Sequence, residues 1–495
     1  MSWYLKKRVQ SLHYVMKNGT EVQQDTLDDL LSQLKKTSFG KEHKAKSIKS
    51  YRDFKSAIPL QTYDQIKVYI ERTIKGEQKV LWPGDIKWFA KSSGTTSDKS
   101  KFIPVSFDAL NECQFKGSRD TLAFYYHQNA DAKVFQGKGL IIGGSHQVNE
   151  LSPNSFYGDL SAVMMNNLPF IANYLATPSI EIALLDNWEE KMDRIVAETM
   201  HEDVTNISGV PSWTLLVIKR LLEKTGAKTL KEVWPNLELY IHGGVNFNPY
   251  REQFKALIGS DKMNYRETFN ASEGFFGVQD KEGEDMLLML DYGIFYEFIP
   301  MEHFGEKDPP TIWLDEIELN TNYAMVITTN AGLWRYILGD TIQFTSKSPY
   351  RIKITGRTKL FINAFGEELM IDNAETALAA AQLKCDCLVA EFTAAPVYLS
   401  TKDKGSHEWL IEFDRPPKDL EEFATILDDE LKKTNSDYEA KRAGNLALLK
   451  PQLNILPNGT FYKWMKSKNK LGGQHKVPRL SNNRKILEDI LKFDA

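Results

Sequence analysis

Residues 204–244 read VTNISGVPSWTLLVIKRLLEKTGAKTLKEVWPNLELYIHGG and give the clearest sign of the fold class. Residues 204–210 form a short apolar run typical of a strand. Pro211 then begins a helical pattern that extends to Lys224, because proline suits the first turn of a helix. A second apolar run, 237–242, stops at two glycines. A strand, a helix and another strand in this order predict a βαβ unit within a largely parallel sheet.

The rest of the chain extends this pattern. The first ninety residues read as helices, for example over 26–35, where leucines recur at helical spacing. From residue 285 onward, strand-like segments follow one another with few helical stretches. The strands expected at 286–290, 294–299, 312–319 and 324–329 predict an antiparallel β lobe. Further helices are expected at 189–202, 248–258, 373–382 and 420–434, and further strands at 351–355, 387–393 and 408–413.

The predicted fold class is therefore α/β. We expect a large N-terminal domain with mostly parallel sheets and an antiparallel β lobe, followed by a small mobile α+β C-terminal domain. The expected bounds are 1–356 for the N-terminal domain, 357–360 for a hinge and 361–495 for the C-terminal domain. This boundary rests partly on a family resemblance.

Composition and charge exclude several classes of protein. The chain has 495 residues, of which 42% are hydrophobic and 26% charged, with a net charge of −4 and a pI of about 6.2. No basic excess is available for binding nucleic acid or a membrane surface. No run approaches the roughly 20 apolar residues that cross a membrane, and residues 1–8 lack the apolar stretch of a secretory signal. We therefore expect a cytoplasmic protein without nucleic-acid or membrane partners. The sequence leaves its oligomeric state open between a monomer and a weak dimer.

The three cysteines, Cys113, Cys385 and Cys387, are too few for a disulfide framework. Cys385 and Cys387 would suit half of a metal site, but no second pair exists to complete it. We expect them instead to be alternate residues of a short strand within 383–389.

Residues 92–101, SSGTTSDKSK, follow an apolar stretch at 86–90 and combine small residues, hydroxyl side chains and lysines. Small residues let successive backbone N–H groups converge on an anion, hydroxyls add donors, and a lysine supplies positive charge. A triphosphate requires these groups. The Gly-x4-Gly-Lys spacing of kinases and GTPases is missing. The alternative interpretation is a solvated turn rich in serine and threonine.

Two later segments each contain an acidic residue at or next to their end. In 269–274, FNASEG, Phe269 can stack on adenine and Glu273 can hold Mg²⁺, which prefers oxygen ligands. In 333–340, LWRYILGD, Asp340 can accept hydrogen bonds from both ribose hydroxyls. Taken alone, each segment has a simpler interpretation, namely an aromatic core position followed by a surface acid, and a turn at the end of a strand.

The order of these segments resembles the adenylate-forming enzyme superfamily, and more closely the Gretchen Hagen acyl acid–amido synthetases, an auxin-responsive family with bacterial relatives. The resemblance extends over nearly the whole chain and includes four further stretches: IPLQTYD at 58–64, VLWPG at 80–84, KWFAK at 87–91 and GQHKVPR at 473–479. The chain is similar to a bacterial-type member of that family. The resemblance implies a large and a small domain with ATP bound between them.

Matching positions imply a role for each candidate site residue. The loop at 92–96 would wrap the phosphates, Gly243 to Val245 would border adenine, and Arg357 would lie in the hinge. Phe269 stands where the family usually has tyrosine, so that stacking survives and a hydroxyl is lost. The residues implied to bind ATP are Ser92, Ser93, Gly94, Thr95, Thr96, Gly243, Gly244, Val245, Phe269, Asp340 and Arg357.

Three residues are implied to act in catalysis. Glu273 matches the glutamate linked to Mg²⁺ and is the candidate metal-binding residue. Lys101 follows the phosphate loop, and Lys476 matches a C-terminal lysine that approaches the phosphates in one domain orientation. The implied cofactors are ATP and Mg²⁺.

Two positions depart from the family pattern. Asp98 stands where the loop usually has glycine, and beside bound phosphates it would weaken ATP binding unless Lys99 and Lys101 offset its charge. Ile337 stands where the superfamily often has arginine, and Arg335 is the candidate substitute.

The implied reaction has two steps. A carboxylic acid attacks the α-phosphate of ATP to form an acyl-adenylate and pyrophosphate, and an amine, such as that of an amino acid, then displaces AMP. The alternatives are an acyl–coenzyme A synthetase with the same first step, a phosphotransferase, which the missing kinase-type loop disfavours, and a non-catalytic nucleotide-binding protein, which Asp98 and Ile337 would suit. The aromatic-rich stretches 115–126 and 166–174 would suit an acyl pocket or, as the favoured interpretation, core helices.

Overall fold

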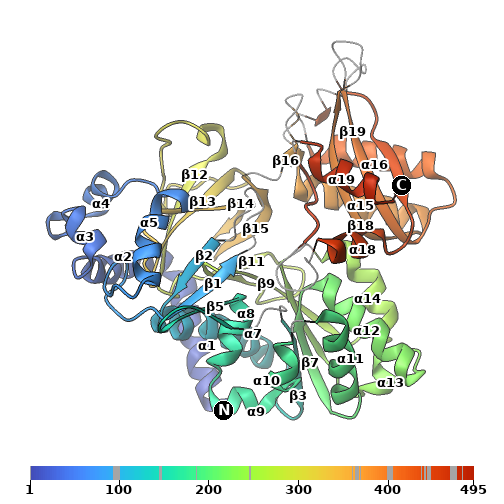
Figure 1. Cartoon of the computed structure of the whole chain (residues 1–495), viewed down its shortest axis with the longest axis horizontal. Coiled ribbons are helices and arrows are strands. Elements are labelled where there is room, and N and C mark those ends of the chain that lie inside the picture. The colour runs from blue at the N-terminus through green and yellow to red at the C-terminus, as the bar shows by residue number, and fades with distance from the viewer. Residues whose placement is uncertain are drawn as a thin grey trace.

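The computed structural model of this chain describes residues 2–92, 101–143, 148–185, 187–244, 247–358, 361–362, 367, 369–398, 405–435, 438–439, 442, 448–468, 476–481 and 483–494. These residues form a large N-terminal domain and a smaller C-terminal domain (Figure 1). The mixed α/β architecture confirms the predicted fold class.

Helices begin the chain, as predicted: α1 (Ser2–Lys17), α2 (Gly19–Leu34), α3 (Ser38–Glu42), α4 (Tyr51–Ala57) and α5 (Tyr63–Ile74). The leucines of α2 that share one helical face are buried in the main hydrophobic core. Gln23 of α2 is fully buried and donates hydrogen bonds to the carbonyls of Leu290 (2.9 Å) and Ile294 (2.8 Å). Its side-chain oxygen accepts one from the amide of Tyr296 (2.9 Å). These bonds fix α2 to the sheet.

One mixed sheet of eleven strands is the framework of the N-terminal domain. In spatial order the strands are β12 (Ile294–Pro300), β13 (Asn322–Thr329), β14 (Tyr336–Lys347), β15 (Tyr350–Arg357), β11 (Met286–Leu288), β10 (Gly274–Val278), β9 (Asn264–Ala271), β8 (Leu239–Gly243), β7 (Val204–Gly209), β3 (Lys138–Ile142) and β6 (Ala176–Thr177). Neighbours from β9 to β6 are parallel, and those from β12 to β9 are antiparallel. The predicted antiparallel lobe is thus continuous with the parallel sheet.

The segment 204–244 forms the predicted unit, with α12 (Pro211–Thr225) between the parallel strands β7 and β8. The neighbouring helices are α11 (Trp188–Thr199), α13 (Leu230–Val233) and α14 (Arg251–Ile258), and with these strands they enclose a second core. A 3₁₀ turn, η3 (Asn248–Tyr250), precedes α14. The strand predicted at 312–319 is wrong, because a turn at 314–316 leaves only isolated bridges at its two ends.

A second, four-stranded sheet has the order β2 (Lys101–Val105), β1 (Trp88–Ser92), β5 (Ser155–Gly158) and β4 (Asn149–Ser152). After β2 the chain passes through α6 (Phe107–Ala109), a π-helical turn η2 (Leu110–Gln114) and α7 (Phe115–Gln128). After β5 follow α8 (Leu160–Asn166), α9 (Phe170–Leu175) and α10 (Ile180–Ala183).

The C-terminal domain has its own sheets. One pairs β16 (Phe361–Ile362) with β17 (Leu369–Met370), and the other has the order β18 (Leu388–Tyr398), β19 (Gly405–Arg415) and β20 (Gln452–Leu456). Its helices include α15 (Ile371–Cys385), α16 (Leu420–Thr434), α18 (Thr460–Ser467) and α19 (Lys485–Asp494). The large sheet ends at Arg357, within the expected hinge at 357–360. That the chain bends there stays a prediction.

The two neighbouring cysteines do not lie on a strand. Cys385 is the last residue of α15, Asp386 takes a left-handed conformation with φ of 48°, and Cys387 immediately precedes β18. The strand predicted over 383–389 is therefore wrong, because the helix continues to Cys385 and ends at a left-handed cap.

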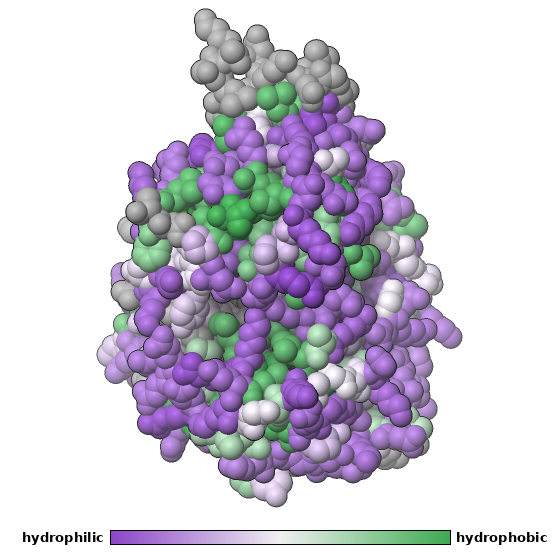
Figure 2. Space-filling view, turned by 90° about the vertical axis from the view of Figure 1, so that its right-hand side faces the viewer, coloured by the Kyte–Doolittle hydropathy of each residue, from purple (hydrophilic) through white to green (hydrophobic). Residues whose placement is uncertain are grey.

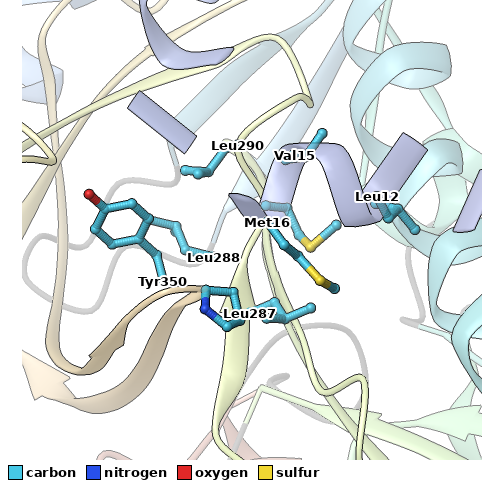
Figure 3. Close-up of a pocket in the computed structure, with 9 residues that line it drawn as sticks. Leu12, Val15, Met16, Leu287, Leu288, Leu290 and Tyr350 are labelled. Carbon is cyan, nitrogen blue, oxygen red and sulfur yellow. The ribbon is translucent and has the colours of Figure 1, made fainter. Parts of the chain in front are cut away.

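A void lined by apolar side chains lies between α1 and the strands β11 and β15 (Figure 3). Leu12, Val15 and Met16 approach it from the helix, and Leu288 and Tyr350 approach it from the sheet. It has room for about one water molecule, so it is a packing void rather than a ligand site.

The surface in Figure 2, which is the right-hand side of Figure 1, is mainly hydrophilic, with apolar residues gathered in smaller areas. Among the residues described, no helix combines the length and apolar character needed to cross a membrane.

Candidate active site

The end of β8 brings the two domains into contact. Gly244 follows the strand with φ of +79°, and Lys476 of the C-terminal domain donates a hydrogen bond to its carbonyl oxygen. This left-handed backbone favours glycine, and a Cβ at Gly244 would lie 2.7 Å from the Lys476 ammonium. The Lys476 side chain is exposed, yet the surrounding protein lowers its pKa to about 8 by desolvation. The positive charge of Arg357 adds to this shift, and Asp340 and Glu375 oppose it.

Asp340 and Arg357 face each other on the neighbouring strands β14 and β15. The Arg357 Nε donates to Asp340 Oδ1 over 2.7 Å, and the negative charge of Asp340 is the main cause that raises the pKa of the guanidinium. The Asp340 side chain is 8% exposed and that of Arg357 is 44% exposed. The amide of Thr358 donates to the carbonyl of Gly339 over 2.9 Å. The start of the predicted hinge is therefore fastened to the Gly-Asp segment.

Glu273 lies in the tight turn between β9 and β10, where Ala271 pairs with Gly274. Its side chain is half-buried, and burial raises the pKa of its carboxyl above the ordinary value. The positive charges of Lys101 and Arg357 oppose this shift, and the negative charge of Asp340 adds to it. Four charged groups predicted as site residues therefore interact across the ends of three strand pairs.

Two tyrosines that the sequence interpretation did not assign join this group. Tyr336 is fully buried, and its hydroxyl has no hydrogen-bond partner among the residues that the structure describes. Burial raises its pKa, and the charge of Glu273 adds to the shift. The hydroxyl of Tyr63 accepts a hydrogen bond from the amide of Phe102 (2.8 Å), and the Lys101 ammonium lies 5.5 Å from the centre of its ring. Both tyrosines belong to stretches singled out in the sequence, which was the available signal.

The stretch 58–64 holds α5 against the strand that carries Asp340. The amide of Gln61 donates to the carbonyl of Arg335, and the amide of Ile337 donates to the carbonyl of Gln61, each over 2.9 Å. This parallel bridge places Tyr63, the first residue of α5, near Lys101. The stretch 58–64 therefore positions Tyr63 through backbone hydrogen bonds to the strand that carries Asp340.

Arg335 does not substitute for the arginine missing at position 337. Its guanidinium is buried and bonds to both carboxylate oxygens of Glu297, over 2.8 and 2.9 Å. It also donates to the carbonyls of Lys55 and Ile58 and to the hydroxyl of Thr311. The proposed substitution is wrong because these partners hold the guanidinium in the core. Ile337 packs against a small apolar cluster that contains Ile299 and Val326.

The predicted phosphate loop connects β1 to β2. Ser92 and Lys101 are paired across the two strands at its base. The predicted loop residues Ser93, Gly94, Thr95 and Thr96, together with Asp98, lie outside the described residues, as does Val245. Their roles stay predictions, and of Ser92 only the backbone is described.

Phe269 lies on β9, and only 6% of it is exposed. It packs edge to face against Phe276, with 5.0 Å between ring centres. Its stacking on adenine stays a prediction, since the ring is part of the main core.

The two aromatic-rich stretches behave differently. In 115–126, Phe115, Phe124 and Tyr125 are buried, so the core interpretation is confirmed there. In 166–174, by contrast, Phe170 is 86% exposed and its neighbours on α9 are also exposed, so the core interpretation is wrong. Helix α9 spans only Phe170–Leu175 and buries none of its residues.

Several bonds link the C-terminal domain to the parallel half of the large sheet. Asp414 forms an ion pair with Lys219 of α12 (2.8 Å) and accepts a hydrogen bond from Gln253 of α14. Arg479 donates to the hydroxyl of Tyr250 over 2.7 Å.

Burial raises the pKa of Glu267 on β9 and of Glu375 on α15 to about 7 in each case. No sequence motif pointed to these two carboxyl groups.

Comparisons with known proteins identify the family of this chain. Family models described as the GH3 family N-terminal, central and C-terminal domains match residues 8–263, 287–357 and 372–485. The chain is 22% identical to the indole-3-acetic acid-amido synthetase GH3.4 of Arabidopsis thaliana, covering 96% of this chain and 91% of that protein. It is 24% identical to the jasmonoyl–L-amino acid synthetase GH3.5 of Oryza sativa subsp. japonica, covering 98% and 96%.

The fold is similar to that of solved structures. The GH3.15 acyl acid amido synthetase superposes with a TM-score of 0.80 at 18% identity, over 98% of this chain and 95% of that one. A 2-hydroxyisobutyryl-CoA ligase in the postadenylation state superposes with a TM-score of 0.58 at 12% identity, over 91% and 86%. Because the three family models together span most of its length, this chain belongs to the GH3 (Gretchen Hagen) family.

Proposed function

We propose that this chain uses ATP to adenylate a small carboxylic acid and then transfers the acyl group to the amine of an amino acid. The observation that carries the proposal is the convergence of Glu273, Asp340, Lys101, Arg357 and Lys476 from both domains at the end of β8 and β9. The activities named for the GH3 relatives from Arabidopsis and rice support it.

In the first step the substrate carboxylate attacks the α-phosphorus, and the bond to the β-phosphate oxygen breaks to release pyrophosphate. Positioning and charge neutralisation suffice, since no covalent enzyme intermediate is required. Lys101 and Lys476 supply positive charge near the phosphates. Asp340 accepts hydrogen bonds from the ribose hydroxyls, and its ion pair with Arg357 orients the carboxylate.

The residues present fit a magnesium ion. Mg²⁺ is commonly held by one or two carboxylates together with substrate phosphates, so the absence of a three-residue ligand cluster among the described residues does not conflict with it. Burial disfavours the charged form of Glu273, and a bound cation would stabilise that form. The Tyr336 hydroxyl, which has no hydrogen-bond partner among the described residues, belongs to the same cluster of side chains as Glu273. Glu273 would hold the ion, which when bound disperses charge on the phosphates.

In the second step the amine attacks the acyl carbon, AMP leaves with the electron pair of the broken bond, and the amine loses a proton. The hydrogen bond from Lys476 to Gly244 joins the C-terminal domain to the end of β8. A swing about 357–360 would release this contact and admit the amine, and closure would exclude water, which hydrolyses acyl-adenylates.

A pyrophosphate-release screen tests the first step. The full chain is incubated with ATP, Mg²⁺ and a panel of small acids, with and without a mixture of amino acids, beside a Glu273→Gln control. We expect release with at least one acid, and detection of the matching amide by mass. Replacing the amino acids by coenzyme A separates the acyl–coenzyme A alternative, and no pyrophosphate with any acid would contradict the proposal.

A further inference from the structure

The turn that carries Glu273 is held from one side by the π-helical turn η2. The side-chain nitrogen Nε2 of Gln114 donates a hydrogen bond to the backbone carbonyl of Ala271 over 3.2 Å, at the end of β9. The thiol of Cys113 accepts a hydrogen bond from the amide of Phe275 over 3.1 Å, at the start of β10. Adjacent residues of one helical turn thus bind both strands that lead into and out of Glu273.

Both residues close a π-helical turn, a feature that is rare in proteins and frequent at functional sites. One turn further, Gly117 lies directly against the ring of Phe275, which a Cβ at this position would overlap. The helix therefore lies as close to the Glu273 turn as its backbone allows.

The side-chain amide of Gln114 points its nitrogen toward the turn and leaves its oxygen buried without a hydrogen bond. Gln114 is 2% exposed, and its side-chain oxygen has no partner among the described residues. The orientation is determined by chemistry, because only the NH₂ group can donate to the carbonyl of Ala271. An apolar side chain at position 114 would leave no oxygen unsatisfied. What glutamine offers over such a side chain is therefore the hydrogen bond to Ala271.

We propose that Gln114 and Cys113 are positioning residues that hold the Glu273 carboxylate where it meets the magnesium ion and phosphates, an inference that rests on the proposed function. Neither residue contacts the reacting atoms. Groups that orient a metal-binding residue typically change metal affinity or activity by about 10-fold to 100-fold when removed.

The test compares Gln114→Leu with a matched control, Gln23→Leu. Gln23 is also a buried helical glutamine that donates to sheet carbonyls, but it holds the turn between β11 and β12 instead. The first readout is amide hydrogen exchange of the full chain without ligands. We expect faster exchange of residues 272–276 in Gln114→Leu only. Exchange there at the wild-type rate would overturn the proposal.

The second readout is the Mg²⁺ concentration that gives half-maximal pyrophosphate release. We expect about a tenfold increase for Gln114→Leu, largely recovered at saturating Mg²⁺, and none for Gln23→Leu. Faster exchange with an unchanged Mg²⁺ requirement would overturn the role toward Glu273. If the wild type released no pyrophosphate with any acid, the proposed function would fail. Amide hydrogen exchange would still decide whether Gln114 holds the turn at Glu273.

A second pair of variants keeps the test decisive if Gln114→Leu does not fold. Cys113→Ser retains an acceptor for the Phe275 amide, and Cys113→Ala does not. We expect the Phe275 amide to exchange at nearly the wild-type rate in Cys113→Ser and faster in Cys113→Ala. Equal exchange in both variants would show that the thiol does not hold the turn.

Discussion

Two arginine–carboxylate pairs lie along one short stretch of chain and have opposite surroundings. Arg335, just before β14, pairs with Glu297, and the two side chains are 6% and 1% exposed. Asp340, on β14 itself, pairs with Arg357, whose side chain is 44% exposed. The first pair is enclosed by Lys55, Ile58 and Thr311, which use its remaining donors. The second presents a guanidinium to solvent near Glu273.

The difference separates a structural role from a functional one within the same chemistry. A buried pair whose donors are all used cannot rearrange to meet a ligand without leaving a charge unpaired. An accessible pair can exchange its partner for a ribose hydroxyl or a phosphate at small cost. The Arg335 pair therefore holds α4 and the stretch 58–64 against the sheet. The Arg357 pair is the one that we propose for the site.

Arg335→Met should give the largest effect on stability. The substitution leaves Glu297 buried without its cation and two carbonyls without a donor, which costs about 3–5 kcal/mol. Urea denaturation would measure the loss. The fraction that stays folded should keep the wild-type KM for ATP. A raised KM with unchanged stability would place Arg335 in the site and remove the contrast between the two pairs.

Glu273→Gln should give the largest effect on chemistry. The amide keeps the size of the side chain but removes the charge that would hold Mg²⁺, so we expect pyrophosphate release to fall by about 10²-fold or more. The free energy of unfolding should not fall, because burial already disfavours the charged form. Release at a near-normal rate would contradict the role of Glu273.

Asp340→Asn should act mainly on nucleotide binding. The loss of charge-assisted hydrogen bonds to ribose, worth about 1.5–3 kcal/mol, should raise the KM for ATP by about tenfold or more. Asp280→Asn is a matched control, because Asp280 forms a buried pair with Arg351 over 2.8 Å elsewhere in the same sheet. An equal rise of KM in both variants would indicate a general effect on the sheet.

Much of the fold was predictable because its signals are local. The βαβ pattern of 204–244 and the helical leucines of α2 follow from periodicity alone. The strand predicted at 312–319 failed because a short apolar run does not reveal a turn inside it. The cysteine strand failed because α15 continues to Cys385 and ends at the left-handed Asp386, which an alternating pattern does not reveal.

Motif chemistry named Glu273 and Asp340, and the family resemblance named Lys476. In the structure the charge of Asp340 acts on both other groups, and the roles of all three residues stay predictions. Arg335 could not be assigned from the sequence, since its distance from Ile337 along the chain says nothing about which way its side chain points. Gln114 was equally hidden, because its partner Ala271 lies 157 residues further along the chain.

Lys476 should produce the smallest effect, a pH dependence. Its ammonium has a pKa lowered to about 8 by desolvation, so the charged form that would assist phosphate binding is lost as pH rises through this value. We expect kcat/KM for ATP to fall above pH of about 8, by about tenfold for each further pH unit. Measurements across this range should show the decrease in the wild type.

Lys476→Arg sharpens the comparison, since a guanidinium keeps its charge throughout this range. The decrease above pH 8 should disappear in this variant, although a bulkier head group beside Gly244 should lower the rate at every pH. In the wild type, bound phosphates would favour the charged ammonium, so kcat should decline at a higher pH than kcat/KM does. A decrease that persists in Lys476→Arg would assign the titration to another group, and Glu375, which contributes to the pKa of Lys476, would be the next to test.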